Sequence, residues 1–343
     1  MAKGIVVLLL CFLVFGCVFN TNAQAQANSC TRSIIIGPWC TPSCMQFAPP
    51  TTVCDDPCEF FCGCTYKTDA CAPPAAPQET GCKYCTAGRP IDLATGDTYI
   101  SQTDIGLPGL GGGLSLTRTW NSIWPPTQTG AIPFMFGPNW TSTYQERVFI
   151  GGDGYVKYAQ SDGAFWSFGA TTTGSVITYS ASAPANTGAI LTTGSSNWTL
   201  TFKNGEKRLF DNASGVLTAI IDRNGNTTRL AYDALNRLTT VTDPALRHLT
   251  FNYLNGSGFL VSAVTSDVGV TVSYTYDAQG RLAQVTNPDS TKFSFQYDGN
   301  SNITAVLDTN GKVLEAHTYD SLNRGLSSSR ANGVESVTVK YSQ

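Results

Sequence analysis

Five aspartates recur at nearly regular spacing in the second half of this 343-residue chain, and each directly follows an aromatic residue. They are Asp211, Asp233, Asp277, Asp298 and Asp320. Repeated carboxylates could bind Ca²⁺, which takes about six to eight oxygen ligands, or could form the acid/base pair of a retaining glycosidase, with carboxyl groups about 5 Å apart. Carboxylates on successive β-hairpins would lie roughly 10 Å apart. That separation favours a role in turns over metal binding or catalysis.

The aromatic residues define the period of the repeat. They are Phe210, Tyr232, Tyr253, Tyr276, Tyr297, Tyr319 and Tyr341, at intervals of 22, 21, 23, 21, 22 and 22 residues. A second turn signal, such as Asn224-Gly225 or Asp243-Pro244, lies midway in each repeat. Two turns in one period leave two strands of about six residues each, so every repeat is predicted to be one β-hairpin.

Each residue of the Tyr-Asp step has a predicted structural role. Tyr buries its ring at the end of a strand, brings its hydroxyl to a polar partner and stacks on the aromatic ring one repeat away. Asp accepts the backbone N–H two residues further on. Left-handed backbone is expected at Gly215, Asn236, Gly258, Gly280, Asn302 and Asn323. The structural residues predicted for the turns are Tyr232, Asp233, Asn236, Tyr276, Asp277, Gly280, Tyr297, Asp298, Tyr319 and Asp320.

The strands alternate in a way that gives the predicted sheet one apolar face. Phe293, Phe295 and Tyr297 share a face, and most other repeats have apolar residues at the same offsets. Glu315, His317 and Tyr319 depart from this pattern, which predicts a less buried strand or one nearer an edge. About thirteen strands in one open sheet should curl and need a cover. We expect that cover to come from residues 88–205 or from another chain, which would also seal the edge at Tyr341.

The first 27 residues are predicted to be an export signal that is removed. Lys3 precedes an apolar stretch from Ile5 to Phe19, and the small-residue pattern of a cleavage site follows at 23–27. A retained membrane anchor is a weaker alternative, because the apolar stretch is shorter than the ~20 residues of a membrane-spanning helix. Lipidation at Cys17 is another, which the bulky Phe15 and the apolar Val18-Phe19 make a minor option. We expect a secreted, periplasmic or cell-surface protein with no membrane span in the mature chain.

A cysteine-rich module is predicted for residues 28–87, with a proline-rich linker at 71–81. Its ten cysteines are Cys30, Cys40, Cys44, Cys54, Cys58, Cys62, Cys64, Cys71, Cys82 and Cys85. An even number of cysteines in an exported chain favours disulfides, although the sequence does not give their pairing. Zinc is the rival, because Cys82 and Cys85 form half of a zinc knuckle.

The rest of the chain offers little other chemistry. Only 13% of residues are charged and the net charge is -3, which argues against a nucleic-acid partner. His248 and His317 lie in different repeats and are expected at the surface or rim, and the Gly-rich stretch at 108–115 is expected to be a flexible connection. We predict no catalytic, cofactor-binding or metal-binding residue, no cofactor and no enzymatic activity. Any of the five tryptophans could stack on a sugar, although core packing is the commoner role: Trp120, Trp124, Trp140, Trp166 and Trp198.

The repeats resemble the bacterial Rhs/YD-repeat proteins, whose motifs are Tyr-Asp, Gly-Arg-Leu and a Thr-Asp-Pro or Asn-Gly turn. The matching segments are YDALNRLTTVTDP at 232–244, YDAQGRLAQVTNP at 276–288 and YDSLNRGLSS at 319–328. Residues 88–122 resemble the β-domain that commonly precedes such repeats, and 222–233 resemble its junction with the first repeat. The resemblance implies a spiralling β-sheet that closes into a hollow shell, often around a C-terminal toxin. With about six hairpins, we expect a curved, open part of such a shell.

Together these features predict an all-β chain with a β-rich domain at 88–205 and YD hairpin repeats at 206–343. The expected function is that of a non-enzymatic secreted or cell-surface structural or interaction protein, with a truncated or orphan scaffold of a polymorphic-toxin system as one form of it. The alternative is a surface carbohydrate-binding module or adhesin. The expected partner is another protein chain on the open sheet face or edge, or a surface polysaccharide.

Overall fold

The computed structural model describes residues 31–36, 86–87, 90–124, 134–152, 154–173, 176–330 and 333–341, the first of these as backbone only. The predicted export signal, all ten cysteines of the predicted disulfide module and its linker lie outside the described residues. Those predictions therefore stay predictions. In the described part of the chain, no helix is both long enough and apolar enough to cross a membrane.

The first half of the described chain contains one single-turn helix and twelve strands. They are β1 (Thr31–Ile36), β2 (Thr86–Ala87), β3 (Ile91–Asp92), β4 (Tyr99–Leu107), η1 (Leu110–Gly112), β5 (Leu114–Asn121), β6 (Trp140–Ser142), β7 (Arg147–Ile150), β8 (Val156–Ala159), β9 (Phe165–Thr173), β10 (Val176–Ala183), β11 (Ile190–Thr193) and β12 (Asn197–Thr201).

The second half consists of hairpins, as the 22-residue period predicts. Its strands are β13 (Lys207–Asp211), β14 (Leu217–Ile221), β15 (Thr227–Tyr232), β16 (Leu238–Thr242), β17 (His248–Tyr253), β18 (Val261–Ser266), β19 (Thr271–Tyr276), β20 (Leu282–Thr286), β21 (Lys292–Tyr297), β22 (Ile303–Leu307), β23 (Val313–Tyr319), β24 (Gly325–Arg330) and β25 (Val334–Tyr341). We call residues 207–341 the repeat array.

Strands β7 to β25 form one antiparallel sheet in which each strand pairs with the next along the chain. The sheet continues from β12 into β13 across the predicted domain boundary at 205/206. Strand β1 then pairs with β25 in parallel, from Thr31 opposite Ser336 to Ile36 opposite Tyr341. The edge at Tyr341 is thus covered by residues 31–36, so the prediction that residues 88–205 or another chain seal this edge is wrong.

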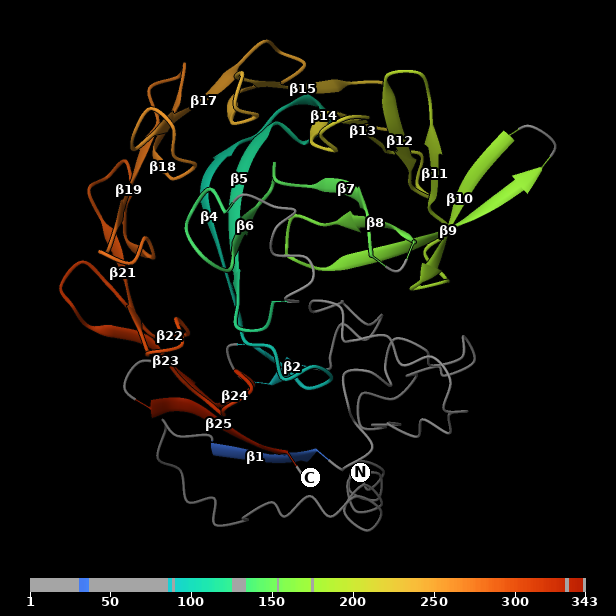
Figure 1. Cartoon of the computed structure of the whole chain (residues 1–343). Helices are drawn as coiled ribbons and strands as arrows, with labels where there is room; N and C mark the ends of the chain where they lie inside the picture. Colours follow the sequence, from blue (N-terminus) through green and yellow to red (C-terminus); the bar gives the residue numbers. More distant parts are fainter. Residues whose placement is uncertain are drawn as a thin grey trace, which may run out of the picture.

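The large sheet curls around a small three-stranded sheet of β4, β5 and β6 (Figure 1). A reason for the curl recurs in every repeat: the register between strands shifts at the tyrosine, for instance between Ala231 and Tyr232 and between Thr275 and Tyr276. Such bulges add an unpaired residue and increase the local twist. One bulge per hairpin therefore bends the sheet steadily, as the sequence predicted for an open array.

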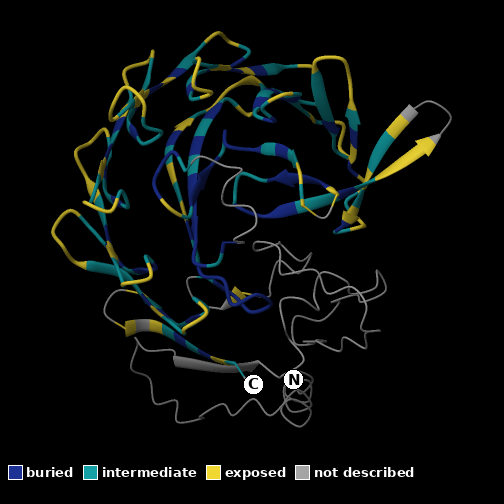
Figure 2. Ribbon diagram, viewed as in Figure 1, coloured by how far each residue is buried: buried dark blue, intermediate teal, exposed yellow. Residues whose placement is uncertain are grey.

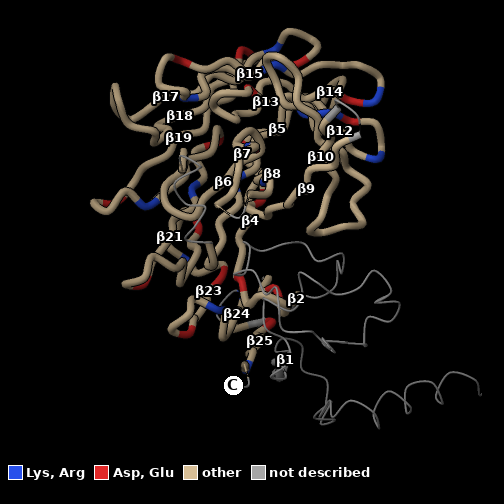
Figure 3. The backbone as a smooth tube through the Cα atoms, turned by 45° about the vertical axis from the view of Figure 1, so that its right-hand side comes forward, with Lys and Arg blue, Asp and Glu red and all other residues tan. Residues whose placement is uncertain are grey.

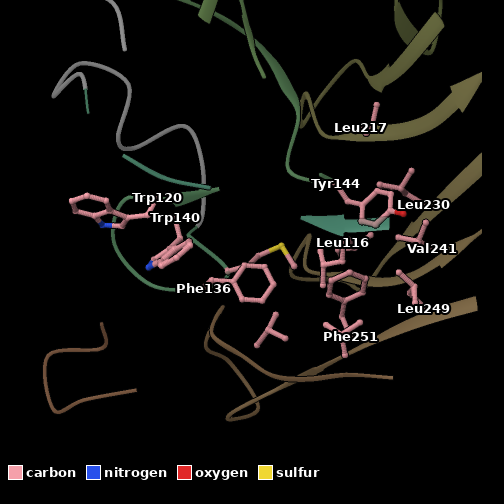
Figure 4. Packing of buried hydrophobic residues seen from close by; sticks show 14 of the residues in the cluster. Leu116, Trp120, Phe136, Trp140, Tyr144, Leu217, Leu230, Val241, Leu249 and Phe251 are labelled. Atoms are coloured by element: carbon pink, nitrogen blue, oxygen red, sulfur yellow. The ribbon is translucent and has the colours of Figure 1, made fainter. Parts of the chain in front are cut away.

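The concave face of the array is covered by residues 90–124 and 134–146, which we call the enclosed segment. Figure 2 shows buried residues along the strands of the enclosed segment and exposed residues at the outer turns of the array. The two parts share one apolar core, in which Leu116 and Tyr144 of the enclosed segment lie among residues of the array (Figure 4). The labelled residues of the array are Leu217, Leu230, Val241, Leu249 and Phe251. The prediction that residues upstream of the repeats cover this face is confirmed.

The prediction of a less buried strand at 313–319 is wrong. His317 is only 3% exposed, and β23 is paired on both sides, with β22 and β24. A buried imidazole thus occupies the inward position at which β21 has Phe295. The prediction was based on the polar residue types of this strand. The burial of β23 is set by its pairing with β22 and β24, which these residue types do not change.

Candidate functional site

The carboxylate of Asp233 builds the turn that follows its strand. One oxygen accepts the backbone N–H of Leu235 at 2.9 Å and that of Arg237 at 3.0 Å, and the other accepts Arg237 Nε at 2.7 Å. Desolvation raises the pKa of Asp233, but the hydrogen bonds from Arg237 and Leu235 outweigh it, so the pKa lies below its usual value. The predicted role of Asp in holding the turn is confirmed, with the N–H two residues on as one of three donors.

The same arrangement recurs at the other Tyr-Asp steps. Asp277 binds the N–H of Gln279 and both the N–H and Nε of Arg281, and Asp320 binds Leu322 and Arg324 in the same way. Asp298 keeps the two backbone bonds, but its side-chain partner is the amide of Asn302, at 3.0 Å. Many of the charged residues lie at the turns (Figure 3).

Left-handed backbone occurs three residues after the aspartate. Asn236, Gly280 and Asn323 have φ of 58°, 75° and 63°, as predicted. The prediction for Asn302 is wrong, because Ser301 takes this conformation with φ of 66°. Counting from the aspartate would have found it: Asn302 stands four residues on, where other repeats have the arginine. The prediction for Gly258 is also wrong, since it lies outside the left-handed region in an enlarged turn.

Each repeat tyrosine donates its hydroxyl hydrogen to a carbonyl 15 or 16 residues earlier. The bonds run from Tyr232 to Leu217, Tyr253 to Leu238, Tyr276 to Val261, Tyr297 to Leu282, Tyr319 to Ile303 and Tyr341 to Gly325, at 2.6–2.8 Å. The acceptor is the first residue of the preceding repeat's second strand. Burial raises the pKa of these phenols, in the case of Tyr297 to about 12, so the hydroxyls remain protonated donors at physiological pH.

The tyrosine ring contacts the turn arginine of the preceding repeat, where the sequence had predicted another aromatic ring. The Arg237 guanidinium lies 4.6 Å from the Tyr253 ring centroid, and Arg281 and Arg324 lie 4.7 and 4.1 Å from those of Tyr297 and Tyr341. Arg281 also donates to the carbonyl of Asp298 at 3.2 Å. Sequence reasoning missed this arginine, although its fixed place four residues after Asp was a usable signal. It links one turn to the next along the rim.

The midway turns of Asp222, Asp243 and Asp308 use aspartate in the same manner. The sequence indicated the turn at Asp243-Pro244, but not the role of these three carboxylates. Each accepts the N–H groups two and four residues further on. Asp243 also binds Arg247 Nε at 2.8 Å, and Arg247 reaches the carbonyl of Leu107 in the enclosed segment at 3.3 Å. A carboxylate-centred turn therefore occurs on both rims of the array.

The enclosed segment attaches where the repeats depart from the consensus. The turn after Tyr253 lacks the aspartate and is longer, and here the N–H of Val261 donates to the carbonyl of Met135 at 2.9 Å. At the last described hairpin pair, Gly325 N–H donates to Gly96 O at 2.8 Å. A side chain at Gly325 would collide with Thr98, so this glycine allows the close approach of the two parts.

A buried ion pair within the enclosed segment, at the centre of the core, is hydrogen-bonded by a tyrosine of the array. Arg118 is 0% exposed and binds both carboxylate oxygens of Asp104, one through Nη2 at 2.7 Å. The hydroxyl of Tyr274 donates to Asp104 at 2.7 Å, and the guanidinium lies 4.7 Å from the Trp140 ring centroid. The site is fully enclosed, so it serves to position the segment and is inaccessible to a substrate.

The remaining candidate residues take structural places. His248 is half-buried and lies 2.9 Å from the Thr242 hydroxyl; the prediction of a surface or rim position is wrong for His317, which is buried 3.6 Å from Glu315. Trp120, Trp124 and Trp140 are core residues, and Trp166 and Trp198 are half-buried. Among the described residues, no three His, Cys, Asp or Glu side chains are grouped so that they could hold a metal ion.

Two family models match the chain. Residues 88–168 match the domain of unknown function DUF6531, and residues 172–342 match the teneurin YD-shell. Together they span nearly all of the sequence after the cysteine-rich region, in the order that the motifs indicated. The chain belongs to the Rhs/YD-repeat family.

Similar curated proteins are much longer than this chain. The tRNA nuclease WapA of Bacillus subtilis (strain 168) is 28% identical over 149 residues, which are 43% of this chain and 6% of that protein. The tRNA(Glu)-specific nuclease WapA of Bacillus subtilis subsp. natto is 30% identical over the same shares. The nuclease activities in these names belong to those whole proteins, of which the matched region is a small part.

Solved structures also resemble the chain, but they superpose on it poorly overall. The crystal structure of TcdB2-TccC3 without its hypervariable C-terminal region has 17% identity and a TM-score of 0.29, covering 69% of this chain and 12% of that one. The Photorhabdus luminescens Tc holotoxin pore has 14% identity and a TM-score of 0.27, covering 71% and 14%.

Proposed function

We propose that the protein is a non-enzymatic scaffold of the YD-repeat type that acts outside the cell, as a structural or interaction protein. One observation carries this proposal: the recurring Asp, Arg and Tyr side chains are consumed by the architecture. At the turn of Asp277, both carboxylate oxygens, the guanidinium of Arg281 and the hydroxyl of Tyr276 have partners within the chain. A residue that holds its own turn is unavailable for chemistry on a substrate.

The enclosed segment supports the same proposal. It fills the concave face that a hollow shell would leave open, and it is fastened by main-chain bonds at Val261 and Gly325 and by the hydrogen bond from Tyr274 to Asp104. This part of the array is therefore a solid body, suited to hold, cap or present something attached to it. A relation to toxin systems is part of this proposal and is supported by the family match and by the nucleases among the relatives.

Location and activity test the proposal together. Intact producing cells are treated with an added protease and probed with antibodies against the repeat array, and cell fractions are compared with a known cytosolic protein. We expect the chain outside the cytosol. The purified chain is also incubated with tRNA, because two relatives are named tRNA nucleases, and we expect the RNA to stay intact. A strictly cytosolic chain, or RNA cleavage that co-purifies with it, contradicts the proposal.

A surface carbohydrate-binding protein is the second candidate. It is favoured by the ring pair of Tyr179 and Trp198, whose centroids lie 5.3 Å apart and which are both half-buried near the start of the sheet. Exposed aromatic faces can stack on sugar rings. Retention on a panel of polysaccharides that is lost in Trp198→Ala but kept in Trp120→Phe would support it. Retention no better than that of an unrelated β-protein would exclude it for those polysaccharides.

A further inference from the structure

Five asparagines of the chain directly precede a glycine, and one of them lies in a different setting from the others. The pairs are Asn204-Gly205, Asn224-Gly225, Asn255-Gly256, Asn310-Gly311 and Asn332-Gly333. Such an asparagine can lose ammonia when the glycine nitrogen attacks its side-chain carbonyl carbon, because glycine has no Cβ to hinder the approach. Asn332 lies outside the described residues, so the structure shows the setting of the other four pairs.

In three of these pairs the glycine N–H closes a turn. The bonds run from Gly205 to the carbonyl of Phe202 at 2.9 Å, from Gly225 to that of Asp222 at 3.0 Å and from Gly311 to that of Asp308 at 3.0 Å. A glycine nitrogen held in this way must break its hydrogen bond before it can lose its proton or turn toward the asparagine side chain. The turn therefore protects these three asparagines.

The pair Asn255-Gly256 lies in the enlarged turn between β17 and β18, and its glycine is not held. Among the described residues, none accepts a hydrogen bond from the N–H of Gly256. Asn255, Gly256 and Ser257 are all exposed, so water reaches this part of the turn. A side chain at Gly256 would find nothing within 4 Å. The glycine nitrogen is thus free to approach the side chain of Asn255.

The side chain of Asn255 already has a donor at the atom where charge develops during the attack. Its Oδ1 accepts the N–H of Gly258 at 2.6 Å. Attack at Cγ places negative charge on this oxygen, and a donor that already points at it stabilises that charge, as in acyl transfer. Asn204 has a similar donor, the N–H of Glu206 at 3.0 Å, but lacks the free glycine N–H. Asn255 combines both features.

We propose that Asn255 is a site of spontaneous deamidation in the folded protein. The Gly256 nitrogen gives up its proton and bonds to Cγ of Asn255, and the side-chain nitrogen takes up a proton and leaves as ammonia. The product is a cyclic succinimide. Water then adds to either of its carbonyls and opens the ring, which restores the N–H of Gly256 and yields aspartate or isoaspartate. No oxidant or reductant takes part, and water is the only co-reactant.

The array supplies a cation beside the product. The carbonyl of Asn255 accepts Arg237 Nη1 at 3.3 Å, and that of Gly258 accepts the same atom at 3.1 Å. In isoaspartate the main chain runs through the former side chain, so this carbonyl of residue 255 becomes a carboxylate. Its bond from Arg237 is then charge-assisted, which stabilises the product. The inference goes beyond the scaffold function and does not depend on it.

Peptide mapping of the full chain tests the proposal, because the four asparagines lie in separate tryptic peptides. The folded chain is incubated in mildly acidic and mildly alkaline buffer and then digested. Mass spectrometry measures the fraction of each amide that has become a carboxyl, and labelling by an isoaspartyl methyltransferase detects isoaspartate. Asn255 should react about fivefold faster than the others or more, since each of those must first break a turn hydrogen bond. The rate should rise in alkali, because the glycine nitrogen loses a proton. A rate at Asn255 no higher than at the other three overturns the proposal.

Unfolding and one substitution identify the cause of the selectivity. In concentrated urea the turn bonds are lost, so the four rates should converge; a preference for Asn255 that persists there contradicts the role of the fold. Gly256→Ala should melt at the wild-type temperature, because the new Cβ has open space. It should slow deamidation at Asn255 strongly, since the Cβ hinders the nitrogen, and leave the rate at Asn204 unchanged as the internal control. An unchanged rate at Asn255 in this variant overturns the proposed attack by the Gly256 nitrogen.

Discussion

The enclosed segment and the repeat array hold their carboxyl groups in opposite electrostatic settings. In the enclosed segment, burial raises the pKa of Asp97 and of Glu146 above the usual values, even though each has hydrogen-bond partners. In the array, hydrogen bonds from the turns outweigh desolvation and lower the pKa of Asp233 and Asp277. In the enclosed segment burial disfavours the charged form of these carboxyl groups, and in the array hydrogen bonds stabilise it.

The difference teaches how each part tolerates damage. The array repeats one small arrangement at every turn, so each copy contributes a modest share of the stability. The enclosed segment depends on single contacts, such as Arg118 with Asp104, that occur once and in the centre of the core. Substitutions should therefore be severe and specific in the enclosed segment and mild and interchangeable in the array.

The largest effect is expected for Arg118→Leu. It leaves the carboxylate of Asp104 buried without its cation, and breaking a buried pair in this way costs about 3–5 kcal/mol. Urea unfolding followed by tryptophan fluorescence measures the loss. The double variant Arg118→Leu/Asp104→Leu should recover part of it, because neither charge is then buried alone. If Arg118→Leu is as stable as the wild type, the ion pair does not make the enclosed segment more sensitive to substitution than the array.

The next effect concerns the charge of Asp97. Its folded pKa is raised, so its stabilising contribution is complete below the unfolded value and is lost as the pH rises through the folded value. Asp97→Asn should remove this slope and leave the chain more stable than the wild type near neutral pH. Thermal melts from about pH 4 to about pH 8, roughly the window of this linkage, measure it. Parallel profiles of melting temperature against pH for the wild type and Asp97→Asn would contradict the raised pKa of Asp97.

A smaller loss is expected for Tyr276→Phe, at the contact between the two parts. Its hydroxyl donates to Val261 O at 2.7 Å and lies 3.3 Å from the carbonyl of Met135 in the enclosed segment. Loss of the donor leaves buried carbonyls unsatisfied, at a cost of about 1–3 kcal/mol. Tyr253→Phe, whose hydroxyl binds only the carbonyl of Leu238, should cost less. Equal losses in urea unfolding would mean that the contact with Met135 adds nothing.

The smallest effect is expected for Asp277→Asn, within the array. The variant loses the charge that binds Arg281, and a partly exposed charge-assisted bond of this kind contributes about 1 kcal/mol. Since the pKa of Asp277 is lowered, its contribution is present above the unfolded value and is lost as the pH falls through the folded value. The loss should therefore vanish in acid melts. Asp308→Asn, whose turn has Lys312 in place of the arginine, should cost less at neutral pH.

Much of the array could be predicted from the sequence because its information is local. A fixed period, an aromatic residue at each strand end and turn residues after it specify hairpins without reference to distant parts. The errors at Asn302 and Gly258 came from counting from the aromatic residue instead of from Asp298, or from assuming a turn of standard length. Position within the turn decides the backbone conformation, and residue type follows it only loosely.

The contacts between the two parts could not be predicted. Nothing near Arg118 indicates that Asp104 and Tyr274 meet it, since Tyr274 lies in another hairpin more than a hundred residues away. The burial of His317 depends on what faces β23 and not on its own strand. The departure of the turn after Tyr253 from the consensus is visible in the sequence, and it marks the place where Met135 docks. An exception in a repeat can therefore indicate a contact with another part of the chain.

The parallel pairing of β1 with β25 has a consequence for the order of assembly. Every hairpin of the array joins residues that are neighbours in the chain, so it can form as soon as its own residues leave the ribosome. Strand β1 is made first but finds its partner roughly 300 residues later, and closing so long a loop is slow compared with forming a hairpin. The last edge of the sheet is therefore sealed only after synthesis of the array is complete, and until β1 pairs with it the outer edge of β25 stays open to its surroundings.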